Sequence, residues 1–276
     1  MALVLEGRYP AVEIQAHGGQ AVMDAILGIL AEKGVLHEPT ERLEESLARA
    51  ETLRVAGILL DQADGALDRE LHEIQVLGDG EEKRRRLDLL LDRSKLGMRL
   101  ETGWRIVLTG RPNVGKSRLL NALAGYDRAI VSPQAGTTRD VVTVRAAIDG
   151  WPVEIADTAG IRQQAKGLEF AGMERAFLAS MNADLVLLVL DRSEPLADQD
   201  RELIGTYPQS LLVANKSDLP GSWNSAEVAA HAVSAETGAG LEALLEAISR
   251  RLVQNPPPKG CGVPIRPDQV ERIRKL

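Results

Sequence analysis

Apolar residues recur along the chain with two different periods, and the change between them separates two regions. Over residues 43–74 they return every three or four positions with charged residues between them, which predicts a long amphipathic helix beginning near Thr40. Two glycines within residues 78–80 interrupt this pattern, and a second helix is predicted over 82–100. We therefore expect a helical hairpin domain over residues 37–101.

Beyond the hairpin, the apolar residues gather in short continuous runs. Those at 104–109, 185–190 and 210–214 have the length of strands, and polar or glycine residues follow them. Strands that are apolar throughout are typical of a parallel sheet covered by helices on both faces. The region 102–253 is therefore predicted to be an α/β domain with a mostly parallel sheet, and its last helix is predicted at 241–252.

Two shorter segments flank these regions. Residues 1–36 are predicted to hold a strand and a helix over 21–33, which are too few to form a core of their own. In the segment 254–276, three consecutive prolines at 256–258 stiffen a linker, and a short helix is predicted over 267–275. We interpret the first segment as the remnant of an N-terminal domain and the second as a linker and tail.

Composition mainly excludes classes of protein. A chain of 276 residues allows one α/β domain and a smaller helical part. One cysteine excludes an internal disulfide framework, and without a signal peptide or a long apolar run we expect a cytoplasmic protein with no membrane association. The net charge of -7 disfavours broad non-specific binding of nucleic acid, and the 3% of aromatic residues disfavours base-stacking platforms. The arginines at 84–86 are interpreted as a solvated face, with contact to RNA as the alternative.

The first motif that carries chemistry lies between the strand over 104–109 and a helix predicted at 118–124. It reads Gly-Arg-Pro-Asn-Val-Gly-Lys-Ser over residues 110–117. In such a phosphate-binding loop, backbone N–H groups and the N-terminus of the helix surround phosphate oxygens. Lys116 is predicted to reach the β- and γ-phosphates, and the Ser117 hydroxyl is predicted to ligate Mg²⁺.

A second motif, Asn-Lys-Ser-Asp over residues 215–218, identifies the base. The Asp218 carboxylate can accept from the N1–H and N2–H₂ groups of guanine, a donor pair that adenine lacks. Lys216 would lie along the base, and the Ala235 backbone N–H would meet O6. The predicted ligand is GTP or GDP. The predicted nucleotide-binding residues are Asn113, Val114, Gly115, Lys116, Ser117, Arg118, Asp157, Asn215, Lys216, Asp218, Ser234 and Ala235.

Two further segments are typical of a switch that hydrolyses GTP. The Thr138 hydroxyl lies where it can close on Mg²⁺ and the γ-phosphate, Asp157 can hold Mg²⁺ through water, and the Gly160 N–H can contact the γ-phosphate. The next residue is Ile161, whereas Ras-like enzymes have a Gln that positions the attacking water. Hydrolysis is therefore either slow or assisted by another group.

Four stretches together resemble the MnmE/TrmE family of tRNA-modification GTPases, within the TrmE-Era-Der class of P-loop GTPases. They read GRPNVGKSRLLNALAG at 110–125, RAIVSPQAGTTRD at 128–140, DTAGIR at 157–162 and GMERA at 172–176. The resemblance implies a Ras-like G domain over 102–253 and a shortened form of the family's helical domain over 37–101.

The resemblance also implies a mechanism that uses a second cation. In this family a potassium ion beside the phosphates replaces an arginine finger, and a Glu beyond the second switch orients the water. By position, the potassium ligands would be Asn113, Ser132, Gln134 and Thr137, and the water-orienting residue would be Glu169. The implied state for hydrolysis is a transient homodimer formed through the G domains. The predicted catalytic residues are thus Lys116, Thr138, Gly160 and Glu169.

The biological role is left open between three alternatives. The first is a divergent enzyme of tRNA wobble-uridine modification with a flavoprotein partner. The second is a regulatory or ribosome-associated switch of the Era/Der type, and the third is a nucleotide-binding protein that barely hydrolyses. Residues 13–19 resemble the end of the family's folate-binding domain, but we expect no folate binding, and His17 is interpreted as part of a turn. Cys261 lies in a context unlike the family's terminal cysteine motif, and we expect an ordinary free thiol.

Overall fold

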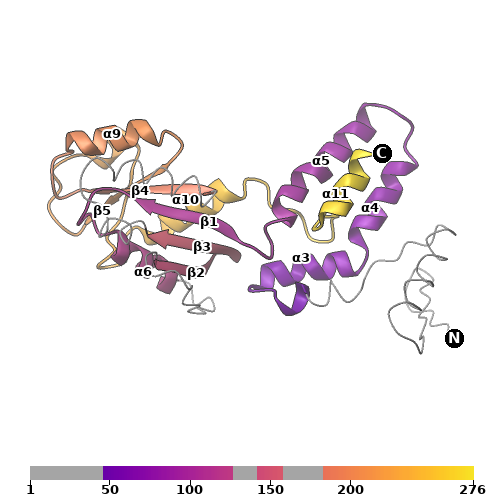
Figure 1. Cartoon of the computed structure of the whole chain (residues 1–276), viewed down its shortest axis with the longest axis horizontal. Helices are drawn as coiled ribbons and strands as arrows, with labels where there is room; N and C mark the ends of the chain where they lie inside the picture. Colours follow the sequence, from indigo (N-terminus) through magenta and orange to yellow (C-terminus); the bar gives the residue numbers. More distant parts are fainter. Residues whose placement is uncertain (1–45, 127–141, 158–182) are drawn as a thin grey trace. The chain divides into compact units, whose positions relative to one another are not determined.

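The computed structural model describes residues 46–126, 142–157 and 183–276 (Figure 1). The predicted remnant domain over 1–36 lies outside these residues, as does the start of the first predicted helix near Thr40. Among the residues that are described, no helix is both long enough and apolar enough to cross a membrane.

The first long helix predicted from the apolar period is wrong in one respect, because the chain forms shorter helices there. These are α3 (Leu53–Ala63) and α4 (Ala66–Gln75), followed by α5 (Glu81–Gly97). Thr52 begins α3, and its hydroxyl accepts from the Val55 N–H. Gly65, with φ of 76°, separates α3 from α4 in a left-handed conformation that suits glycine. The apolar period continues across this break, so periodicity alone did not reveal it.

The α/β domain contains a six-stranded sheet in the order β2-β3-β1-β4-β5-β6. The strands are β1 (Trp104–Thr109), β2 (Val142–Ile148), β3 (Trp151–Asp157), β4 (Leu185–Asp191), β5 (Leu211–Asn215) and β6 (His231–Ala232). All neighbouring pairs are parallel except β2 with β3, which confirms the predicted mostly parallel sheet. Its central strands are almost fully buried, as their continuous apolar runs require.

Helices cover both faces of this sheet. The helix α6 (Lys116–Tyr126) follows β1, α9 (Asp198–Thr206) follows β4, and α10 (Leu241–Leu252) ends the domain, with a short 3₁₀ helix at Ser225–Val228. The helix α6 packs on β1, β2 and β3 and contacts α10, while α9 packs on β4 (Figure 1). The polar ends of the parallel strands are left at one edge, where loops from several strands meet.

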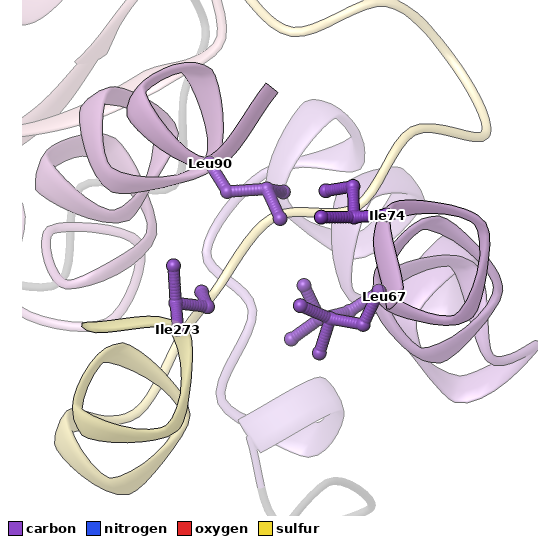
Figure 2. Packing of buried hydrophobic residues seen from close by; sticks show 5 residues of the cluster. Leu67, Ile74, Leu90 and Ile273 are labelled. Atoms are coloured by element: carbon purple, nitrogen blue, oxygen red, sulfur yellow. The ribbon is translucent and has the colours of Figure 1, made fainter. Parts of the chain in front are cut away.

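The segment after α10 returns to the helices at the start of the described chain. Its helix α11 (Pro267–Arg274) packs on α5, and Ile273 is buried in one apolar cluster with Leu67, Leu71, Ile74 and Leu90 (Figure 2). Gly97 permits the close approach of this segment, because a Cβ there would lie 2.0 Å from the Pro264 carbonyl oxygen. We call α3, α4, α5 and the segment 256–276 the helical unit, since α4, α5 and α11 share this apolar cluster and α3 contacts α4.

Hydrogen bonds hold the same segment in place. The Gln62 side chain donates to the Cys261 carbonyl at 3.2 Å and accepts from the Val263 N–H at 2.9 Å. Arg93 binds the Glu70 carboxylate at 2.8 Å and also donates to the Gly262 carbonyl at 3.2 Å. The prolines at 256–258 therefore lead into a packed part of the helical unit. Burial raises the pKa of the Cys261 thiol above its ordinary value, so the thiol stays protonated at neutral pH.

Removal of the Ile273 side chain tests whether this return stabilises the helical unit. Ile273→Ala is expected to lower the free energy of unfolding by about 2–5 kcal/mol, because it leaves a cavity at a position that is 1% exposed. Urea unfolding followed by circular dichroism measures the loss. Arg274→Ala, on the exposed face of α11, is the matched control and is expected to change little. Equal losses in the two variants would contradict the packing role.

A second set of contacts joins α3 to the turn between β2 and β3. The Thr52 hydroxyl donates to the Gly150 carbonyl at 2.7 Å, and Arg54 pairs with Asp149 at 3.1 Å. The guanidinium of Arg54 also lies over the Trp151 ring, 4.9 Å from its centroid. The turn is thereby held from the side of the helical unit.

Candidate nucleotide-binding site

Loops that follow three strands, β1, β5 and β6, meet at the carboxyl edge of the sheet. The loop after β1 carries Asn113 and Gly115, β5 ends at Asn215, and Ala235 lies in the loop after β6. A cavity of about 410 Å³ opens between them. It is lined by Asn113, Gly115, Arg118, Asn215, Lys216, Asp218, Leu219, Ala235 and Glu236. This edge is where open α/β sheets bind ligands, and the predicted motifs are brought together there.

The loop after β1 has the backbone that a phosphate site needs. Gly110 has φ of 139° and Gly115 has φ of 94°, and a Cβ on Gly110 would lie 2.1 Å from the Val189 carbonyl oxygen. Asn113 is left-handed as well, with φ of 65°. The Lys116 ammonium donates to the carbonyls of Gly110 at 3.1 Å and Arg111 at 2.7 Å, so the loop curls around it. The helix α6 begins at Lys116, which directs backbone N–H groups toward the loop.

Two side chains with oxygen atoms that can ligate a metal ion lie together at the base of this loop. The Ser117 hydroxyl donates to the Asp157 carboxylate, which is buried at the end of β3. A hydroxyl and a carboxylate in contact are hard ligands of the kind that Mg²⁺ prefers, and Mg²⁺ bound to nucleotides takes few protein ligands. The residues present therefore fit the predicted ion.

Asn215 connects the phosphate loop to the opposite side of the cavity. Its side chain donates to the Val114 carbonyl at 2.9 Å and accepts from the Ala235 N–H at 3.1 Å. A Cβ on Gly115 would lie 2.4 Å from the Asn215 amide nitrogen, so this contact requires glycine. Because the Ala235 N–H already donates to Asn215, a guanine O6 at that position would share the donor.

Asp218 faces the cavity with its orientation fixed by a neighbour. The Ser234 hydroxyl donates to one carboxylate oxygen of Asp218 at 2.6 Å. This bond sets the rotation of the carboxylate. Arg118 and Glu236, which both line the cavity, form an ion pair across its rim.

Sequence reasoning missed two buried carboxylates that support this site. Asp191 ends β4 and is paired with the Lys216 ammonium, and Asp200 in α9 accepts from the Arg111 guanidinium at 2.8 Å. Burial alone would raise the pKa of Asp191, but hydrogen bonds from Lys216 and Ser193 outweigh it and bring the pKa below its ordinary value. Asp200 raises the pKa of Arg111. Asp191 directly follows the apolar run at 185–190. A polar residue at the carboxyl end of a parallel strand is a signal of a site residue, and it could have indicated Asp191.

Six of the predicted site residues are not among the described residues. They are Ser132, Gln134, Thr137, Thr138, Gly160 and Glu169. Their roles, and with them most of the predicted potassium site, stay predictions. The part that the structure describes contains the predicted phosphate loop, the predicted pair of Mg²⁺ ligands and the predicted base-recognition loop.

Comparison with known proteins agrees with this geometry. The family model described as 50S ribosome-binding GTPase matches residues 105–216. A tRNA modification GTPase MnmE of Lactococcus lactis subsp. lactis is 36% identical over 269 residues, which cover 80% of this chain and 59% of that protein. The MnmE of Xanthomonas campestris pv. campestris is 42% identical over 213 residues, covering 76% of this chain and 47% of that protein.

Among solved structures, the G domain of the T. maritima FeoB iron transporter is 26% identical with a TM-score of 0.42, covering 54% of this chain and 98% of that chain. Structural similarity at this TM-score gives no argument about the function of the chain. The chain spans about three fifths of the length of the Lactococcus relative. Its motifs and its sheet are those of a P-loop GTPase, and over most of its length the chain is similar in sequence to proteins named tRNA modification GTPase MnmE.

Proposed function

We propose that this chain binds GTP and GDP and hydrolyses GTP to GDP and phosphate. The observation that supports the proposal best is the double contact of Asn215, which joins the phosphate loop at Val114 to the base side of the cavity at Ala235. One cavity thus has phosphate-binding backbone on one side and the Asp218 carboxylate on the other. A nucleotide whose base offers two adjacent donors fits both sides.

The described residues divide the work of hydrolysis between them. Lys116 would stabilise the charge that develops on the phosphate oxygens, since its ammonium is already positioned by the loop. Ser117 and Asp157 would hold Mg²⁺, which supplies further positive charge to the phosphates when bound. In-line attack by water would be aided by Thr138 and Gly160, with Glu169 as the residue that orients the water.

We also propose a potassium ion, a dimeric state and partners for this chain, on the basis of its resemblance to the MnmE/TrmE family. Hydrolysis would be stimulated by a potassium ion held by Asn113, Ser132, Gln134 and Thr137, in a transient homodimer formed through the G domains. The substrate of the wider process would be tRNA, with a flavoprotein as partner. The similar proteins are named tRNA modification GTPase, which supports this alternative.

A second candidate function is a ribosome-associated switch of the Era/Der type. The description of the matching family model, 50S ribosome-binding GTPase, favours it. Copurification from a bacterial lysate in the presence of a non-hydrolysable GTP analogue separates the two roles. Recovery of ribosomal subunits without a flavoprotein would contradict a role in modification, and the converse would contradict the ribosomal role.

Nucleotide titration tests the core of the proposal. Fluorescent GDP is expected to bind the purified chain and to be displaced by GDP but not by the same concentration of ADP, since only guanine offers the donor pair that Asp218 accepts. Release of phosphate from GTP is then followed in the same preparation. Failure to bind GDP, or equal displacement by ADP, would contradict the proposed guanine specificity. Binding without phosphate release would leave the third alternative, a protein that barely hydrolyses.

A further inference from the structure

A buried carboxylate lies behind the base-recognition loop without lining the cavity. Asp191 is 3% exposed and is the register partner of Asn215 in the neighbouring strand. Its carboxylate binds the Lys216 ammonium and accepts from the Ser193 hydroxyl at 2.6 Å and the Ser193 N–H at 2.9 Å. Lys216 lines the cavity and Asp191 does not, so Asp191 reaches a ligand there only through Lys216.

Lys216 has a geometry that depends on such a partner. Its φ of 63° is left-handed, a conformation that residues with side chains rarely adopt. About a third of its side chain is exposed although its charged end is held against β4 by Asp191. Lysine stems are apolar, and a stem anchored at its charged end offers a flat purine a fixed apolar surface. Without the anchor, the ammonium would move into solvent and the stem would lose its fixed position.

The main chain beside Asp191 holds the same loop at both ends. The Arg192 N–H donates to the Asn215 carbonyl at 3.0 Å at the start of the loop. At its far end, the Trp223 indole N–H donates to the Asp191 carbonyl at 2.9 Å, and the Ser222 N–H donates to the Arg192 carbonyl at 2.9 Å. The end of β4 thus braces the whole segment that carries Lys216 and Asp218.

We propose that Asp191 is a positioning residue for purine recognition, which holds the Lys216 side chain against the base without touching the nucleotide. The inference rests on the proposed binding of guanine nucleotides and adds to it a residue outside the recognised motifs. Its physical basis is the cost of moving a buried charge without its partner: the Asp191 carboxylate and the Lys216 ammonium fix each other. The expected consequence is slow release of the nucleotide, because the Asp191–Lys216 ion pair, in which Asp191 does not touch the nucleotide, keeps the lysine in place.

A double-mutant cycle tests this inference. Asp191→Ala is expected to weaken GDP binding about tenfold or more, and Lys216→Ala at least as much. In the double variant, GDP binding is expected to be no weaker than in Lys216→Ala alone, because Asp191 acts through that lysine. Asp191→Asn keeps the size and the Ser193 contacts but loses the charge, and we expect it to bind GDP nearly as weakly as Asp191→Ala.

Two further measurements separate positioning from general support of the sheet. Inorganic pyrophosphate, which has no base, is expected to compete equally well in all variants. Glu82→Ala, which removes an exposed ion pair with Arg85 on α5, is the control and leaves GDP affinity unchanged. Additive losses in the double variant, weaker binding of pyrophosphate, or wild-type GDP affinity in Asp191→Asn would overturn the inference. If the wild-type chain fails to bind GDP, the proposed function itself fails and the inference falls with it.

Discussion

Hydrolysis of GTP is expected to be about 10³- to 10⁵-fold faster in potassium than in sodium, the range that an arginine finger provides. The chain has Ile161 where Ras-like GTPases have a water-positioning Gln. The arginine within the phosphate loop, Arg111, is held by Asp200 at 2.8 Å and lies 3.7 Å from Glu194. Since this arginine is engaged on α9, a cation bound near Asn113 is the better source of the missing positive charge.

The measurement is the rate of phosphate release in matched potassium and sodium buffers over a range of protein concentration. Asn113→Ala is expected to abolish the difference between the two salts, because it removes a ligand that lines the cavity. Asn224→Ala is the matched control: Asn224 caps the short 3₁₀ helix, away from the cavity, and its loss is expected to leave the cation response intact. A rate that rises with protein concentration would support dimerisation. Equal rates in both salts would exclude the potassium mechanism for this chain.

Asp218→Asn is expected to lower the affinity for GDP by about 10²-fold or more and to raise the affinity for xanthosine diphosphate. The carboxylate accepts two hydrogen bonds from guanine, and each bond to a charged group contributes about 1.5–3 kcal/mol. An amide can accept only one of them, and its N–H₂ group meets the guanine donors. Xanthine carries a carbonyl at that position, which accepts from the amide instead. The Ser234 hydroxyl can keep its contact with an amide oxygen, so the side chain stays oriented.

Competition against fluorescent GDP with GDP, xanthosine diphosphate and ADP measures this change of preference. Asp149→Asn serves as the control, because it makes the same chemical change at a turn outside the cavity. Asp149 has φ of 51°, a conformation that Asn adopts readily, and its partners are Arg54 and Ser249. The order of base preference is expected to stay as in the wild type. A variant of Asp218 that still prefers GDP would show that another residue reads the base.

The parts of the fold that could be predicted from sequence are those whose signals are local. The strand over 104–109 and the helix over 241–252 match β1 and α10 in full, because a continuous or periodic run of apolar residues begins in each case directly after a glycine. The break between α3 and α4 was missed, since one glycine in a left-handed conformation does not disturb the apolar period. The packing of α11 was missed because it depends on contacts between positions some two hundred residues apart, as in Ile273 with Leu67.

The candidate site divides in the same way. The phosphate loop and the base-recognition loop are continuous in sequence, so their residue types and order were enough to predict Lys116, Asn215 and Asp218. The pairs that support them join residues on different elements, as Asp191 does with Lys216 and Asp200 with Arg111. Their partners are set by strand register and helix position, which no short motif records. The roles of the switch residues rest on the family resemblance alone.

The contacts between the start of α3 and the turn between β2 and β3 bear on where a stable fragment of this protein can begin. A fragment starting at Thr102, where the sequence places the edge of the G domain, would lose Thr52 and Arg54 and with them the hydrogen bond to Gly150 and the cation over Trp151. That indole, 1% exposed in the intact chain, would then meet solvent on the face that Arg54 covers. Glu51 also pairs with Arg145 of β2. We therefore expect a fragment that starts before Glu51 to be more stable than one that starts at Thr102, because it keeps these contacts.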